Sequence, residues 1–183
     1  MLRKLVLLVF VAAFVGGCAD KGAVVKEAET EGTYVDVAGL TYQVQMSRFL
    51  NPGDPEDKQY LQGLPQGVPA ALPGDETWFG VWMRVKNYSG GPLTPATEFT
   101  IIDTEENEFR PVPLDAKTNP FVYEPILLQQ SQVLPAPDTA AASGPIQGSL
   151  ILFRLKTDSL QNRPLVMHID QGEGNEAEID LDL

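Results

Sequence analysis

Few residues of this chain are able to do chemistry, because it has a single cysteine, Cys18, and a single histidine, His168. A zinc site or a Cys–His nucleophile needs several such side chains close together. The two residues stand at opposite ends of the sequence, and alternation places His168 on the polar side of a predicted strand. We therefore expect no transition-metal site and no cysteine or serine triad, which leaves the 25 Asp and Glu residues as the remaining reactive groups.

The acidic residues do not form a recognisable metal-binding loop. Asp103, Glu105 and Asn107 occupy positions 1, 3 and 5 of an EF-hand-like pattern. Position 6 is Glu108 where glycine is needed, and position 12 is Leu114 where a bidentate glutamate is needed. An irregular Ca²⁺ site in the acidic turns around residues 54–57 or 103–106 remains open, although solvated acidic turns explain both segments more simply.

Other catalytic patterns are missing from the sequence as well. There is no G-x-S-x-G motif, and the glycine pairs 16–17 and 90–91 do not precede a helix that would hold phosphate. No two carboxylates stand out as a glycosidase pair. We expect a protein that is not an enzyme and needs no cofactor, with a surface hydrolase acting through acidic loop residues as an alternative.

The cysteine has a different meaning when its neighbours are considered. Arg3 and Lys4 precede an entirely apolar run over residues 5–15, and Gly16 and Gly17 lead directly to Cys18. A basic start, an apolar centre and small residues before a cleavage site are typical of a secretory signal peptide. The apolar run is shorter than the about 20 residues that a membrane-spanning helix needs. We predict a signal peptide over residues 1–17, cleaved between Gly17 and Cys18.

The tetrapeptide Val15-Gly16-Gly17-Cys18 resembles a bacterial lipobox. This resemblance implies that the sulfur of Cys18 carries lipid and that Cys18 is the first residue of the mature chain. Two or more acyl chains anchor a protein stably, whereas one binds only marginally. We expect an extracytoplasmic protein, anchored by lipid to a bacterial cell membrane; the alternative is an ordinary secreted protein with an incidental cysteine.

Charge and composition narrow the remaining classes. The formal net charge of −12 argues against binding nucleic acid or an anionic membrane face through the electrostatic field. The 15 prolines and 16 glycines indicate many turns and few long helices. The length suits one domain, which we place at residues 39–183 after a flexible tether over residues 18–38.

The domain is predicted to be all-β, an immunoglobulin-like sandwich of about seven antiparallel strands. The period-two alternation typical of strands occurs in residues 40–47, 77–88, 99–102, 109–114, 146–155, 165–170 and 179–183. We expect the strand at 146–155 to be central because it is apolar on both faces. Two long Pro-rich insertions, 51–76 and 115–145, interrupt the pattern. One short helix over residues 55–62, with Asp54 as its N-cap, and a helical turn at 158–162 complete the prediction.

The strand at 77–88 contains the clearest candidate binding surface. One face of this strand is apolar and should enter the core: Phe79, Val81, Met83 and Val85. The opposite face then contains Trp78, Trp82, Arg84 and Lys86. Two indoles on an outer face are either covered by another segment of the chain or bind a ligand or partner. They predict an aromatic platform with two cations beside it for an anionic ligand, unless the Pro-rich insertion at 51–76 lies across them.

Three short motifs stand out in the predicted strands: Val85-Lys86-Asn87, the Phe-x-Ile-x-Asp strand at 99–103 and the Gly-x-Leu-x-x-Phe strand at 148–153. Together they resemble a family of bacterial surface domains of unknown function, the DUF4352 type, also called telokin-like or MPT63-like. The resemblance covers residues 39–183 and implies an immunoglobulin-like sandwich in secreted proteins and lipoproteins. It implies no catalytic residue.

Together these features predict a membrane-anchored, non-catalytic binding or assembly module of the cell envelope, with an envelope protein as a candidate partner. A structural envelope protein without a specific ligand is the alternative.

Overall fold

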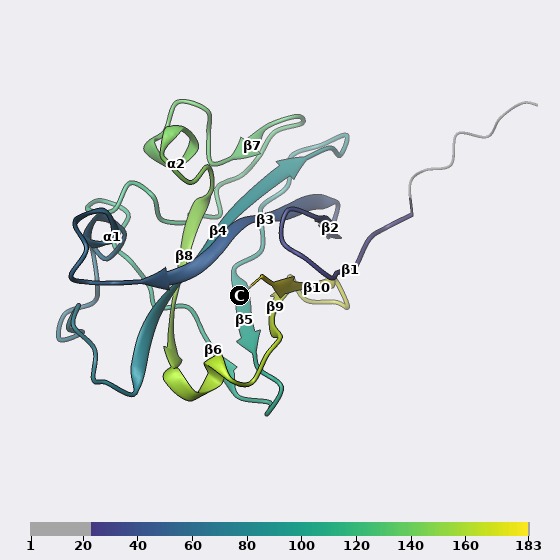
Figure 1. The fold of residues 1–183 in the computed structure, drawn as a ribbon. Helices are drawn as coiled ribbons and strands as arrows, with labels where there is room; N and C mark the ends of the chain where they lie inside the picture. Colours follow the sequence, from purple (N-terminus) through teal and green to yellow (C-terminus); the bar gives the residue numbers. More distant parts are fainter. Residues whose placement is uncertain (1–22, 183) are drawn as a thin grey trace, which may run out of the picture.

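The structure, a computed structural model, describes residues 23–182 as two β-sheets packed face to face (Figure 1). The first sheet has the strand order β1-β10-β9-β5-β6, and the second has β2-β3-β4-β7, with β8 also paired to β4. The elements are β1 Glu27–Ala28, β2 Tyr34–Val37, β3 Leu40–Leu50, α1 Pro55–Tyr60, β4 Glu76–Asn87, β5 Glu98–Ile102, β6 Glu108–Phe109, β7 Val133–Leu134, α2 Ala140–Ser143, β8 Ser149–Lys156, the 3₁₀ turn η1 Thr157–Leu160, β9 Leu165–Asp170 and β10 Glu176–Leu181. The predicted all-β sandwich is confirmed.

The main core lies between the two sheets. Strand β4 contributes the face that the sequence predicts, and all four of its apolar side chains are fully buried: Phe79, Val81, Met83 and Val85. Opposite them, β5 and β9 supply alternating apolar residues such as Ile101 and Met167, which are register partners in the first sheet. Burial of alternating apolar side chains from both sheets is the main driving force for this packing.

A second apolar cluster covers the outer face of the second sheet. It joins residues of the sheet to residues of the two Pro-rich insertions. The sheet contributes Leu50, Trp78, Trp82, Leu150 and Leu152, and the insertions contribute Tyr60, Leu61, Phe121 and Ala141. The insertions are also tied to each other, since the side-chain amide of Asn119 donates to the carbonyl oxygens of Tyr60 and Gln62, each at 3.0 Å. The long insertions are therefore a structural layer on the sheet.

Helix α1 begins as the sequence predicts and ends two residues earlier. The Asp54 carboxylate accepts hydrogen bonds from the backbone N–H groups of Glu56 and Asp57, at 2.7 and 3.2 Å. Asp57 in turn pairs with Arg48 of β3 at 2.5 Å. Burial favours the neutral form of Asp57, but the hydrogen bonds from Arg48 and Asn51 and the charge of Arg48 together outweigh burial and lower its pKa. The ion pair holds the helix against the sheet.

The predicted tether is wrong over its second half. Residues 34–37 form β2, in which Val35 and Val37 are fully buried. Strand β2 joins β3 through a two-residue turn, Ala38-Gly39, with φ angles of 48° and 82°. Positive φ at both central residues is the geometry of a type I′ hairpin. The domain therefore begins before residue 39, and the usual Asn-Gly or Asp-Gly signal for such a hairpin is missing from the sequence.

A half-buried carboxylate, that of Glu31, connects this early segment to the rest of the domain. Glu31 accepts hydrogen bonds from the backbone and side chain of Ser47 in β3, and from the N–H of Asp182. Burial raises the pKa of Glu31, and the nearby Asp182 charge adds to that effect. Strand β1 pairs in parallel with β10. The chain preceding β2 thus adds a strand to the first sheet and is hydrogen-bonded to β3 of the second.

Two other predictions need correction. The predicted strand at 109–114 leaves the first sheet after Phe109, because Pro111 has no N–H to continue the ladder, and the chain crosses to β8. The strand at 146–155 is not central: β8 pairs with β4 along its length, but only isolated bridges at Pro111 and Val122 meet its other edge. Both its faces are buried because the insertions cover the outer one.

Gly148 provides a test of the close contact between β4 and the chain entering β8. A Cβ atom at this position would lie 2.9 Å from the backbone carbonyl carbon of Trp82. We expect Gly148→Ala to destabilise the domain by about 2 kcal/mol, because the backbone must shift to relieve the overlap. Urea unfolding measures the change.

Gly90 is the matched control, since a Cβ there has no neighbour within 4 Å. Gly90→Ala should change stability by less than about 0.5 kcal/mol. Equal effects of the two substitutions would contradict the close approach.

Candidate functional site

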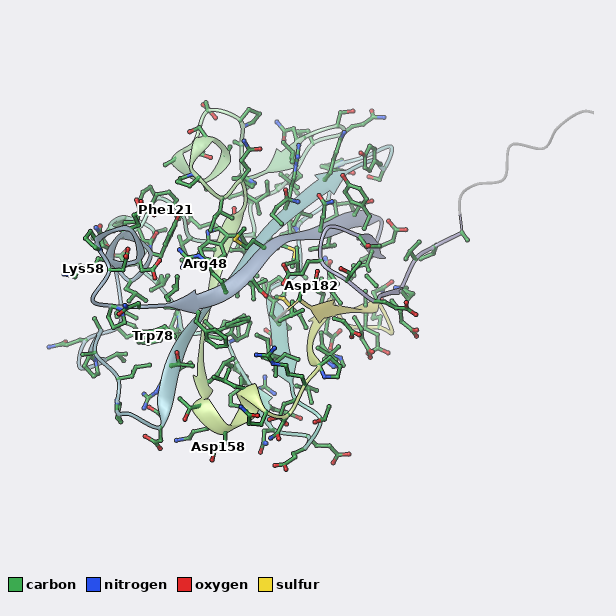
Figure 2. All side chains as sticks on the ribbon, in the orientation of Figure 1. Arg48, Lys58, Trp78, Phe121, Asp158 and Asp182 are labelled. Carbon is green, nitrogen blue, oxygen red and sulfur yellow. The ribbon has the colours of Figure 1, made fainter. Side chains whose placement is uncertain are left out.

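The predicted aromatic platform does not exist as a surface. Trp78 and Trp82 are 1% and 0% exposed, because the insertion at 51–76 lies over them. The Trp78 indole N–H donates to the carbonyl oxygen of Ala70 in that insertion at 2.7 Å. The Trp82 ring lies beneath Tyr60, with 5.0 Å between ring centroids. Figure 2 labels Trp78, Arg48 and Phe121 on the side of the sheet where α1 lies.

The two cations of the predicted platform are separate from the indoles. Arg84 is exposed and lines a small hollow of about 160 Å³ together with Val133, Pro135 and Gln147. Lys86 lies over the ring of Tyr88, with its Nζ 4.3 Å from the centroid. Alternation along β4 places these four residues on one face. In the structure, Trp78 and Trp82 are buried, whereas Arg84 and Lys86 lie towards solvent.

The best candidate site is instead an apolar cleft on the side of the sandwich where β5 faces β8. Its volume is about 250 Å³. Its walls come from β5, from the crossing segment after β6, from the segment after Phe121 and from β8. The lining residues are Thr97, Phe99, Pro111, Val112, Pro113, Leu114, Val122, Tyr123, Pro125, Leu150, Ile151 and Leu152.

Two tyrosines hold the backbone N–H and C=O of Ala96 in place beside this cleft. The Tyr123 hydroxyl donates to the Ala96 carbonyl oxygen at 3.0 Å, and the Ala96 N–H donates to the Tyr42 hydroxyl oxygen at 2.7 Å. Burial raises the pKa of Tyr42 to about 12 and also raises the pKa of Tyr123, so both phenols stay neutral. Tyr123 packs edge-on against Phe99, with 5.1 Å between centroids. The cleft wall is thus held in place by both sheets.

The chemistry of the lining suits binding. Its polar side chains are one threonine hydroxyl and one tyrosine hydroxyl, and the lining includes no carboxylate, imidazole or thiol. His168 is in β9 on the outer side of the first sheet, where its Nδ1 lies 3.4 Å from Glu178. A general base is therefore not available in the cleft, whereas apolar side chains could be desolvated there.

The acidic turn after β5 is organised around one buried carboxylate. Asp103 accepts hydrogen bonds from the N–H groups of Glu105 and Asn107 and from the Asn107 and Asn162 side chains. Burial opposes ionisation, but hydrogen bonds from Asn107, Ser159 and Asn162 outweigh it and lower the pKa of Asp103 to about 2. Asp103 is therefore a hydrogen-bond acceptor that fixes the conformation of the turn. This structural role accounts for an aspartate at position 1 of the EF-hand-like pattern.

A wider polar hollow of about 410 Å³ lies nearby, between this turn and the end of β8. Lys156 bridges Asp75 and Glu76 at its edge, at 3.3 and 2.9 Å. Within residues 23–182, no three acidic, histidine or cysteine side chains are grouped so as to hold a metal ion. Asp75 and Glu76 form surface ion pairs with Lys156 here.

The predicted signal peptide and Cys18, the predicted lipidation site, lie outside the described residues. In the part of the chain that the structure describes, no helix is long and apolar enough to cross a membrane.

Comparison with solved structures places the fold among bacterial proteins of very different sequence. The yjhA protein of Bacillus subtilis superposes with a TM-score of 0.53 at 10% identity, over 84% of this chain and 99% of that one. A functionally unknown protein of Listeria monocytogenes gives a TM-score of 0.50 at 8% identity, over 85% and 83%. The secreted protein MPT63 of Mycobacterium tuberculosis gives 0.47 at 11%, over 88% and 99%, a likeness too loose to support an inference.

No protein-family model matches the sequence, and no curated protein matches it at a significant level. The similarity therefore concerns the fold alone.

The cleft was missed in the sequence because its residues come from four separate segments. Two signals were present: Pro111 and Pro113 marked an edge, and Val122 and Pro125 were apolar residues in a segment without strand periodicity. Neither signal indicated that β5 and β8 would face each other across them.

Asp103 yields a test that combines stability and pH. We expect Asp103→Asn to cost about 2 kcal/mol near neutral pH, because several donors lose a charged acceptor. The folded-state pKa is below the ordinary value of 3.8, so the ionised group stabilises the fold above pH 3.8, and this contribution is lost as the pH falls towards 2.

The difference between wild type and variant should therefore shrink between pH 5 and pH 2 in urea unfolding. A constant difference over that range would show that the carboxylate charge is unimportant. Asp158→Asn, at an exposed turn residue, is the control.

Proposed function

We propose that this protein is a lipid-anchored, extracytoplasmic module of the bacterial cell envelope that binds a partner without catalysis. The anchor is supported by the signal-peptide pattern and by the lipobox-like Val15-Gly16-Gly17-Cys18. Membership of the DUF4352 type is part of the proposal and is supported by the sandwich fold and the three short motifs named above.

The observation that carries the binding role is the apolar cleft. Apolar side chains line it, and the nearby segment adds Ile126 and Leu127, which are 51% and 55% exposed. Exposed apolar surface that is continuous with a cleft is typical of binding sites. The absence of basic or nucleophilic side chains from the lining favours binding over turnover.

The early start of the domain affects how it would be presented. Strand β1 begins at Glu27, so only residues 19–26 separate it from the predicted lipid-carrying Cys18. A chain of eight residues spans at most about 29 Å. An anchored domain would therefore remain close to the bilayer, within reach of other proteins of the same membrane.

Replacing Cys18 tests the anchor. We expect Cys18→Ser to move the protein from the membrane fraction to the soluble extracytoplasmic fraction, because lipid attachment requires the sulfur. Fractionation with immunoblotting measures the distribution, and Thr104→Ser, an exposed change, is the control. Continued membrane association of Cys18→Ser would refute lipid anchoring.

Photo-crosslinking in intact cells tests the binding role. A photoreactive amino acid at Thr97, which is exposed and lines the cleft, should yield a discrete crosslinked product. The same group at Glu29, which is exposed outside the cleft, should not. Identical patterns at both positions, or no product at either, would contradict a binding role for the cleft.

A further inference from the structure

We propose that the cleft binds an extended segment of a partner protein, with alternating apolar residues and flanking Lys or Arg, which adds a strand to the free edge of β5. The inference rests on the proposed binding role and names the chemistry of the partner. Three observations support it: the open strand edge, the shape of the cleft and the charge around it.

The edge of β5 is only partly used within the described residues. Strand β6 pairs with Ile101 and Ile102, and then the chain turns away. The Val112 N–H donates instead to the Leu152 carbonyl oxygen of β8 at 2.7 Å. Residues 98–100 therefore pair with β9 on one side and have no described strand on the other.

The backbone of Phe99 faces the open side. The Asp103 N–H donates towards β6, to the Asn107 carbonyl oxygen at 3.2 Å. In an antiparallel ladder, every second residue directs its N–H and C=O to the same neighbour. Phe99 has the same parity as Asp103, so its backbone groups point where β6 would have continued. An added strand would find a donor and an acceptor there, as in other cases of strand addition.

The cleft suits side chains better than an enclosed small molecule. Its volume of about 250 Å³ is below the range of about 300–1,000 Å³ that is usual for ligand pockets. An apolar cleft beside a strand edge would receive every second side chain of an extended segment.

The negative charge around the cleft favours a partner segment with basic residues at both of its ends. Within the lining segments 97–99, 111–114, 122–125 and 150–152, the charged side chains are the carboxylates of Glu98 and Glu124, both exposed. The whole chain carries a net charge of −12. Such a rim attracts Lys and Arg and repels fatty-acid carboxylates, and a second copy of this acidic chain would also be repelled.

Peptide binding to the purified full-length protein in neutral detergent tests this proposal. The probe is a fluorescein-labelled peptide of sequence KKVTVSVTVKK, and the control peptide, EEVTVSVTVEE, differs only in its flanks. We expect the basic peptide to bind at least about tenfold more tightly, with the difference shrinking as salt rises from about 0.05 to 0.5 M. Equal binding of the two peptides would overturn the charge argument.

Variants assign the binding to this cleft. Glu98 and Glu124 are exposed, so Glu98→Lys with Glu124→Lys should fold normally, as circular dichroism would verify, and should weaken binding about tenfold. Glu29→Lys, an exposed charge reversal outside the cleft, should leave the affinity unchanged. An equal loss in Glu29→Lys would mean a non-specific charge effect and would overturn the assignment.

Backbone pairing has its own readout. N-methylation of every second peptide amide should abolish binding in one phase of the alternation and be tolerated in the other, because only one edge of the peptide faces β5. Tolerance in both phases would refute strand addition. Binding of dodecanoate in place of the peptide would assign the cleft to acyl chains and would also refute the proposal.

The two proposals can fail separately. A crosslinked product at Thr97 in cells, together with no peptide binding, would leave the binding role intact and overturn only the extended basic segment.

Discussion

Strand β4 imposes the constraint on which the rest of the structure depends, because it is buried on both faces over most of its length. One face enters the core between the sheets. The other contains two indole rings that would be exposed to water if no further part of the chain packed on them. Exposing surfaces of that size would cost several kcal/mol. The Pro-rich insertions supply the cover, and β3 and β8 pair with β4 on either side. The protein is therefore a sandwich with a third, irregular layer.

This irregular layer also explains the cleft. The insertion at 115–145 must reach the outer face of the second sheet from the edge where β6 ends, so the chain leaves the first sheet after Phe109 and crosses to β8. Prolines at 111 and 113 suit such a crossing because they need no ladder partner. The crossing leaves part of the β5 edge uncovered and lines the space beside it with apolar side chains. The candidate site is thus a consequence of how the outer face is covered.

Three carboxylates, of which Asp57 and Asp103 are buried and Glu31 is half-buried, have structural roles. Asp57 holds α1, Asp103 fixes the acidic turn, and Glu31 joins the segment before β2 to β3 and to Asp182. Each carboxylate accepts several hydrogen bonds, as buried carboxylates require. These residues would have been reasonable catalytic candidates by type alone, and their saturated hydrogen bonding explains why the site is better sought in the cleft.

Local pattern determined the longer strands, β3, β4, β5, β8, β9 and β10, and the start of α1, because period-two alternation and the Asp54 cap are properties of a few consecutive residues. It also determined which face of β4 entered the core, because every second residue from 79 to 85 is apolar: Phe79, Val81, Met83 and Val85. Alternation could not decide whether Trp78 and Trp82 were exposed, because the answer depends on insertions whose course is set by contacts such as Asn119 with Tyr60. It could not identify β2, whose Ala38-Gly39 turn lacks the usual residues. The cleft belongs wholly to the tertiary structure, because its walls come from segments that only the crossing of the chain between two sheets brings together.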